Sequence, residues 1–174
     1  ALDGRDIAES TSIGDYALFY RGRSLAQLGR TSEAVKTLSS IATSYPDSLI
    51  VHQASVEAGR AALGAGDART AVTVLAGAAS AGNGEALMLT GDAKAALGDS
   101  SGAVAAYRAA WYSAPSSASA PTALTALKSL GFDPETSPGS EKELEARATA
   151  LFDAQQWKDA ASAYRALLTA YPNR

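Results

Sequence analysis

The chain has 174 residues, of which 47% are hydrophobic and 19% are charged, so it is long and apolar enough to fold around a core. Its formal net charge of −3 argues against electrostatic binding to nucleic acid, and no segment approaches the roughly 20 apolar residues of a membrane span. The absence of cysteine excludes disulfides and thiolate metal sites. Alanine and leucine dominate and β-branched runs are nearly missing, which favours an all-α fold.

The clearest local pattern spans residues 15–46 and predicts two helices folded back on each other. Gly29 follows the first helical pattern, as glycine does just past many helix ends. We expect Thr31 to cap the second helix and Pro46 to end it. The apolar positions of this second helix are Ala34, Val35, Leu38 and Ile41.

The same pattern returns in residues 47–82, 84–115 and 141–172. Small residues recur where the two helices cross, namely Gly22, Gly59, Gly91 and Ala148 in first helices and Ala34, Ala71, Ala103 and Ala160 in second helices. Large side chains recur four residues after the second set, as Leu38, Leu75, Tyr107 and Tyr164. Each unit resembles a tetratricopeptide (TPR) repeat of about 34 residues. The resemblance implies an α-solenoid, a right-handed superhelix of antiparallel helix hairpins.

We expect a single TPR-like domain over residues 1–174, in which residues 1–14 are the last turns of a preceding hairpin. Residues 116–140 break the rhythm and predict one extra helix, with Pro121 as its first residue, followed by a loop.

Four helix starts carry polar residues that can cap them. Ser140 and Glu143 form a capping box before the last repeat. Asp67 and Asp99 are expected to cap second helices, and Asp47 or Ser48 the first helix of residues 47–82.

No combination of residues predicts catalysis, and no cofactor or metal is expected. His52 is the only histidine and has no partners for a metal site or a serine triad. Acidic residues at 141, 143 and 145 suit the positive end of a helix dipole better than paired catalytic carboxylates. Trp111 and Trp157 are interpreted as packing anchors.

First helices line the concave groove of proteins in the TPR family, so the resemblance assigns a candidate binding surface. Its members would be Tyr16, Phe19, Arg23, Gln27, Gln53, Val56, Arg60, Glu85, Met88 and Asp92. Arg23 and Arg60 share a repeat position, and two arginines beside aromatic rings can hold an acidic or carboxylate-bearing ligand. The alternative is a solvated groove with salt bridges to Glu57 or Asp92.

A narrower resemblance rests on the run Gly14-Asp15-Tyr16-Ala17-Leu18-Phe19-Tyr20, then Leu28-Gly29-Arg30 and Tyr45-Pro46-Asp47-Ser48. This pattern is similar to the helical, non-catalytic N-terminal region of bacterial soluble lytic transglycosylases, which cleave peptidoglycan in the periplasm. The family's active glutamate lies in a Glu-Ser pair of a lysozyme-like domain. Glu9-Ser10 is the only such pair here and lacks that context, so the segment is expected to be non-catalytic and to continue past Arg174.

The sequence therefore predicts a protein-interaction scaffold of the bacterial cell envelope. By resemblance its partner would be peptidoglycan, a C-terminal catalytic domain or another envelope protein. The alternative is a free-standing TPR adaptor that binds a peptide or protein in its groove.

Overall fold

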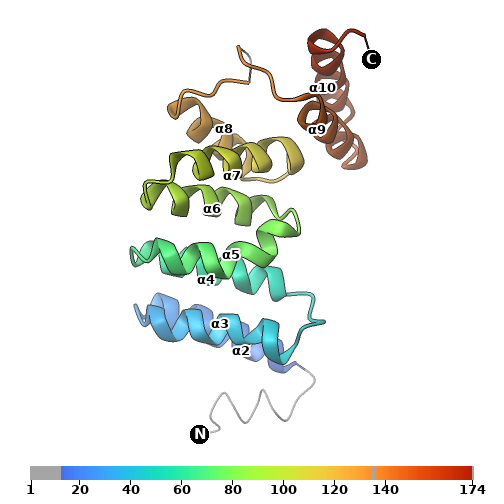
Figure 1. The fold of residues 1–174 in the computed structure, drawn as a ribbon. Coiled ribbons are helices and arrows are strands. Elements are labelled where there is room, and N and C mark those ends of the chain that lie inside the picture. The colour runs from blue at the N-terminus through green and yellow to red at the C-terminus, as the bar shows by residue number, and fades with distance from the viewer. Residues whose placement is uncertain (1–12, 135, 174) are drawn as a thin grey trace, which may run out of the picture. The chain divides into compact units, whose positions relative to one another are not determined.

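The computed structural model describes residues 13–134 and 136–173. These residues contain nine helices and no strand, so the predicted all-α fold of helix hairpins is confirmed for them (Figure 1). The helices are α2 (Gly14–Gln27), α3 (Thr31–Ser44), α4 (Val51–Gly64), α5 (Ala68–Ser80), α6 (Gly84–Ala96), α7 (Ser100–Ser113), α8 (Ala120–Ser129), α9 (Glu141–Asp153) and α10 (Trp157–Ala170).

The chain forms two compact units, residues 1–81 and 82–174. The first contains α2 to α5 and the second α6 to α10. The partial helix predicted for residues 1–14 lies outside the described residues, except for Ile13 at the cap position of α2 and Gly14 as the first residue of α2.

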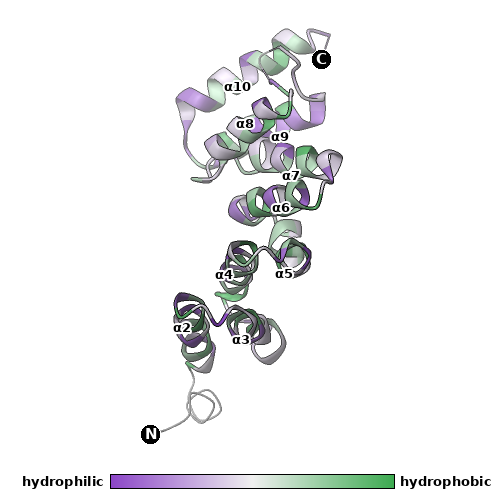
Figure 2. Cartoon of the chain, turned by 90° about the vertical axis from the view of Figure 1, so that its left-hand side faces the viewer, coloured by the Kyte–Doolittle hydropathy of each residue, from purple (hydrophilic) through white to green (hydrophobic). Residues whose placement is uncertain are grey.

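In the first unit, close approach of paired helices depends on glycine. A Cβ on Gly22 would lie 2.5 Å from Leu38 Cγ, and one on Gly59 would lie 2.5 Å from Leu75 Cγ. Real Cβ atoms do not approach so closely, so only glycine lets each leucine fill the helix crossing. Figure 2 shows the resulting pairs, α2 beside α3 and α4 beside α5, nearly end-on.

The second helix of the first hairpin is covered by α4, which packs against α3. The shared core cluster contains Phe19, Leu38, Ile41, Ile50, Ala54 and Ala58. Ser48, in the connection before α4, donates a hydrogen bond of 2.5 Å to Asp15 at the start of α2. The two hairpins are thus joined by apolar packing and by a polar contact at one end.

The second unit repeats this scheme and then departs from it. Gly91 of α6 lies under the ring of Tyr107, and α8 covers α7 as α4 covers α3. Their shared core cluster contains Ala103, Tyr107, Ala110, Ala123 and Leu127. The helix α8 is not followed by a second helix that would complete a hairpin, because the described residues between Leu130 and Ser140 are not helical. Where the sequence predicts one extra helix and a loop over residues 116–140, the structure has α8 followed by described residues outside any helix.

The last hairpin of the second unit, α9 and α10, packs on the rest of that unit through the contact of α9 with α7. Figure 1 shows it running steeply across the direction of α6 and α7. Tyr112 of α7, Leu144 of α9 and Leu167 of α10 form its core cluster. The interruption by α8 thus changes how the final repeat meets the helices before it.

The predicted caps at Asp67 and Asp99 are confirmed, as is the Ser140–Glu143 capping box. Three other predictions at helix starts are wrong. Thr31 is the first residue of α3 rather than its cap, and the cap position holds Arg30, which makes no capping bond. Ile50 rather than Asp47 or Ser48 precedes α4, and Pro121 is the second residue of α8.

Candidate functional site

Five of the predicted groove residues are exposed on the first helices of the first unit. They are Tyr16, Arg23 and Gln27 on α2 and Gln53 and Arg60 on α4, and we call them the α2–α4 surface. The two helices contact each other. The structure therefore presents these polar and aromatic side chains on neighbouring helices of one unit.

Phe19 and Val56 do not belong to this surface, and the prediction for them is wrong. The Phe19 side chain is 3% exposed and Val56 is 4% exposed. Phe19 is buried because its ring fills the core between α2, α3 and α4, beside Leu38 and Ile41. An apolar side chain gains more from this burial than from a solvated groove.

The two arginines of the α2–α4 surface have different contacts, one with an aromatic ring and one with a carboxylate. The Arg23 guanidinium lies over the Phe19 ring, 5.7 Å from its centroid, so the buried ring orients an exposed cation. Arg60 forms an ion pair of 3.2 Å with Glu57, one turn away on α4. An exposed pair of this kind contributes little stability, about 0–1 kcal/mol, so a ligand carboxylate can displace Glu57 at small cost.

The three groove residues predicted in the second unit lie on α6 and are half-buried: Glu85, Met88 and Asp92. Met88 packs against the core cluster of Tyr107, and Asp92 accepts a hydrogen bond of 2.7 Å from the Tyr107 hydroxyl. Burial, together with this bond, raises the pKa of Tyr107 far above its usual value. Met88 and Asp92 thus serve packing between α6 and α7, which leaves them little surface for a ligand.

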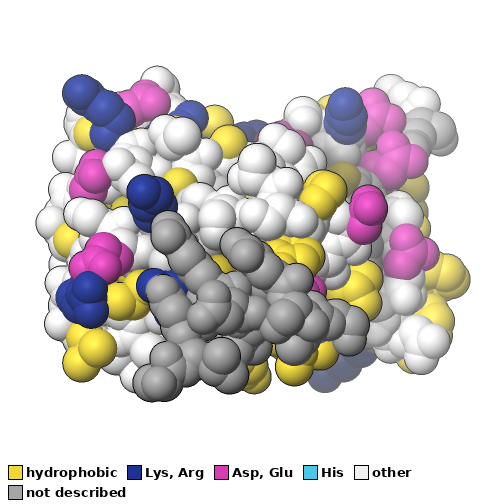
Figure 3. Space-filling model, turned by 90° about the horizontal axis from the view of Figure 1, so that it is seen from below, with side chains coloured by type: hydrophobic (Ala, Val, Ile, Leu, Met, Phe, Trp, Pro, Cys, Tyr) yellow, Lys and Arg dark blue, Asp and Glu magenta, His cyan; other side chains and the backbone are white. Residues whose placement is uncertain are grey.

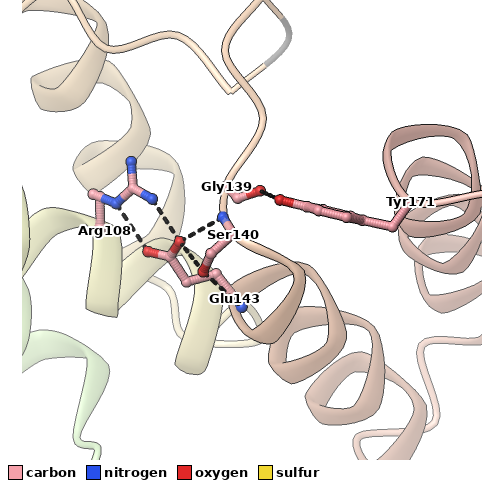
Figure 4. Close-up of polar contacts among 5 residues, drawn as sticks. All are labelled: Arg108, Gly139, Ser140, Glu143 and Tyr171. Carbon is pink, nitrogen blue, oxygen red and sulfur yellow. Dashed lines mark hydrogen bonds and ion pairs between the residues drawn. The ribbon is translucent and has the colours of Figure 1, made fainter. Parts of the chain in front are cut away.

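A polar cluster joins α7 to α9 in the second unit (Figure 4). Arg108 donates two hydrogen bonds, of 2.8 and 2.5 Å, to the carboxylate of Glu143, which also accepts one from the Ser140 backbone. Burial raises the pKa of Glu143, but the hydrogen bonds from Arg108 and Ser140 outweigh it and the net shift is downward. Tyr171 donates to the Gly139 carbonyl nearby. The polar groups of this cluster are paired with one another, so the cluster holds α9 against α7 and has a structural role.

The two tryptophans have different environments. Trp111 is half-buried, and the Arg147 guanidinium lies 3.5 Å from its ring centroid, as expected for a packing anchor. Trp157 is 56% exposed and touches only Phe152 edge-on among aromatic rings of the described residues, so its interpretation as an anchor is wrong.

Trp157 belongs to a surface that the sequence did not reveal. We call it the α10 apolar surface, and its large members are Phe152, Trp157, Tyr164 and Leu168. The three members on α10 are seven and four residues apart, a spacing that predicts an apolar stripe along one side of a helix. This pattern alone does not show whether the stripe is exposed or buried.

The other surface features of the described residues are a hollow near the end of α10 and a mixed distribution of charge (Figure 3). Within the described ranges, no three His, Cys, Asp or Glu side chains are grouped to hold a metal ion. A hollow of about 420 Å³ near the end of α10 contains a single carboxylate, that of Glu141, in its lining. On the face drawn in Figure 3, basic and acidic side chains are interspersed rather than gathered by sign. No helix in the described part of the chain is both long and apolar enough to cross a membrane.

Comparison with known families agrees with this geometry. One model described as a tetratricopeptide repeat matches residues 16–48 and 146–174, and a second with the same description matches residues 56–118. Together these segments cover well over half of the chain, so the chain belongs to the tetratricopeptide repeat family. No curated protein matches it. Tetratricopeptide repeats are generally non-catalytic and bind protein or peptide partners, and this is the class of function that the fold defines.

Proposed function

We propose that the first unit binds an acidic or carboxylate-bearing peptide segment on the α2–α4 surface. The observation that carries this proposal is the exposure of Arg23 and Arg60 at the same repeat position of two contacting helices. Arginine presents a planar array of donors that matches a carboxylate, and charge-assisted hydrogen bonds are the strong ones. Tyr16, Gln27 and Gln53 lie on the same helices and offer further hydrogen-bonding groups.

A binding experiment tests the proposal with a labelled peptide that carries four aspartates and its counterpart with four asparagines. Fluorescence anisotropy should show binding of the aspartate peptide and weaker or no binding of the asparagine peptide. The double variant Arg23→Glu/Arg60→Glu should lose about tenfold or more in affinity, because it removes two attractive contacts of up to about 1 kcal/mol each and adds repulsion in their place. Arg69→Glu, an exposed arginine on the second helix α5, is the matched control. Equal loss in both variants, or no binding of either peptide, would rule out this surface.

We further propose that the module works in the bacterial cell envelope, in the periplasm, as a non-catalytic partner of peptidoglycan-cleaving chemistry. The support is the resemblance of the Gly14–Tyr20 and Tyr45–Ser48 runs to the helical region of soluble lytic transglycosylases. These two runs meet in space, because Ser48 donates its hydrogen bond to Asp15.

Two measurements address the envelope proposal. A gene that encodes a lysozyme-like domain after Arg174 would support it, whereas a stop codon there would favour the free-standing adaptor. Co-sedimentation with purified murein sacculi tests direct wall binding, with bovine serum albumin as the non-binding control. A chain that remains in the supernatant would exclude peptidoglycan as its own ligand and leave a protein partner.

A further inference from the structure

The α2–α4 surface lies on two helix stripes that match position by position. The stripe on α2 holds Tyr16, Tyr20, Arg23 and Gln27, and the equivalent repeat positions of α4 hold Gln53, Glu57, Arg60 and Gly64. Spacings of four, three and four residues keep each set on one side of its helix. Arg23 and Arg60 therefore form one row that runs from α2 to α4, which we call the arginine row.

The packing of neighbouring helices does not use this side of the first helices. The helix α4 packs against α2, α3 and α5, yet its Gln53 and Arg60 remain exposed. The positions of α4 that join the core cluster shared with α3 are Ile50, Ala54 and Ala58. Their equivalents on α2 are Ile13, Ala17 and Arg21. A helix packed on α2 in the way that α3 packs on α4 would therefore leave Arg23 exposed.

The arginine row contains more positive charge than its own surroundings neutralise. Arg60 Nη1 lies 3.2 Å from Glu57 Oε1, whereas no ion pair within the described residues involves Arg23. Two cations on contacting helices repel each other unless each is matched by an anion. A ligand with two carboxylates is therefore favoured over a ligand with one, since each arginine can hold a carboxylate of its own.

The separation of the two arginines restricts the conformation of a bound peptide. The helices α2 and α4 are in contact, and the axes of contacting helices lie about 8–10 Å apart. In a polyproline II helix, with about three residues per turn and a rise of about 3.1 Å, side chains three residues apart lie on the same side, about 9 Å from each other. In a β-strand the nearest side chains on one face are only about 6.6 Å apart. The polyproline II repeat matches the arginine row, and the β repeat does not.

Two exposed tyrosines beside the arginine row favour proline in the same ligand. Tyr16 is 44% exposed and Tyr20 is 59% exposed, and they lie one turn apart on the stripe that contains Arg23. Segments rich in proline dock on surfaces lined by aromatic side chains and bring a preformed polyproline II helix to them. Proline also restricts the residue before it to extended conformations.

We propose that the ligand of the α2–α4 surface is a proline-containing segment in the polyproline II conformation, with two acidic residues three positions apart. This inference rests on the function proposed above for the same surface and adds the conformation and the charge spacing of the ligand. One acidic side chain contacts Arg23 and the other contacts Arg60. The prolines between them hold the two carboxylates at the required distance and reduce the entropy lost on binding.

Two labelled peptides of identical composition and net charge test the inference. Their central residues are Asp-Pro-Pro-Asp in one and Asp-Asp-Pro-Pro in the other. Fluorescence anisotropy at low salt should show the first peptide binding about fivefold more tightly, the upper range for one additional exposed ion pair. Arg23→Gln and Arg60→Gln should each remove this preference, because one remaining arginine cannot distinguish two spacings. Arg69→Gln on α5 is the matched control and should keep it.

The outcomes separate this inference from the proposed function. Equal affinity for the two peptides, lost for both in Arg23→Glu/Arg60→Glu, would retain acidic binding on this surface and overturn the spacing. A preference that survives in Arg23→Gln and Arg60→Gln would also overturn it, because another part of the chain would then read the spacing. Binding of neither peptide would overturn the proposed function together with the inference. Both arginines are exposed, so the thermal midpoints of the variants should match that of the unsubstituted chain.

Discussion

The helices α3 and α10 are second helices of the same repeat pattern, yet their outer faces differ. Leu38 of α3 is 1% exposed, whereas Tyr164, at the equivalent position of α10, is 37% exposed. Leu38 fills the space left by Gly22 on the paired helix α2 and is also packed by α4, whereas no described helix packs on the outer face of α10 around Tyr164. A glycine on the paired helix thus lets the large side chain of the second helix be buried, and the packing of a further helix adds to that burial.

Leu38→Ala should have the largest effect on stability, since it empties a filled crossing between α2, α3 and α4. We expect the free energy of unfolding to fall by about 2–5 kcal/mol, the usual cost of a large-to-small change in a core. Urea denaturation measures it. Leu168→Ala, at an exposed leucine of α10, is the control and should change the free energy of unfolding by less than about 0.5 kcal/mol. Similar losses for the two variants would contradict the contrast between the covered and uncovered helices.

Gly59→Ala should destabilise the first unit by about 1–3 kcal/mol, because the added methyl group meets Leu75 and overpacks the crossing of α4 and α5. Gly77→Ala is the matched control on α5, where a Cβ meets nothing within 4 Å. That change should be neutral or stabilise by about 0.5–1 kcal/mol, because alanine is the better helix former. Thermal melts of both variants check the two signs, and a stable Gly59→Ala would show that the helices do not approach as closely as described.

Glu143→Gln should cost about 1–2 kcal/mol in the second unit, because it weakens the bidentate bonds from Arg108 that join α9 to α7. The pKa of Glu143 is lowered in the folded state, so its stabilising contribution is present above the usual glutamate pKa. That contribution is lost as pH falls through the folded pKa. The thermal midpoint should therefore drop on acidification in the unsubstituted chain and drop less in Glu143→Gln. Parallel pH profiles would show that this carboxylate does not hold the last hairpin in place.

Arg30→Asp should have the smallest effect and the opposite sign. The cap position of α3 holds Arg30, which makes no capping bond, whereas Asp67 and Asp99 accept from the helix backbone at the same place in the next two hairpins. An aspartate at residue 30 should stabilise by about 0.5–1 kcal/mol, with the exposed Arg30–Glu33 pair contributing little to the balance. Asp67→Ala, with a loss of similar size, is the reciprocal control, and destabilisation by Arg30→Asp would contradict the capping argument.

The sequence predicted the structure best at positions where the geometry allows only one type of residue. The recurrence of Gly22, Gly59 and Gly91 predicted the helix crossings, because only glycine admits the large side chain opposite. It failed for Phe19 and Trp157, two aromatic residues whose burial depends on distant elements. Phe19 is buried because α4 closes the core over α2 and α3, and Trp157 is exposed because no described helix covers its face of α10. Helical periodicity identifies an apolar stripe but carries no information about its neighbour.

Thiol labelling tests this account most directly, because the chain has no cysteine of its own. Leu38→Cys and Tyr164→Cys place single thiols at equivalent repeat positions of α3 and α10. In native buffer a thiol-specific reagent should label residue 164 readily and leave residue 38 protected until the first unit unfolds. Equal labelling rates at the two positions in the folded chain would contradict the claim that this repeat position is enclosed in α3 and open to solvent in α10.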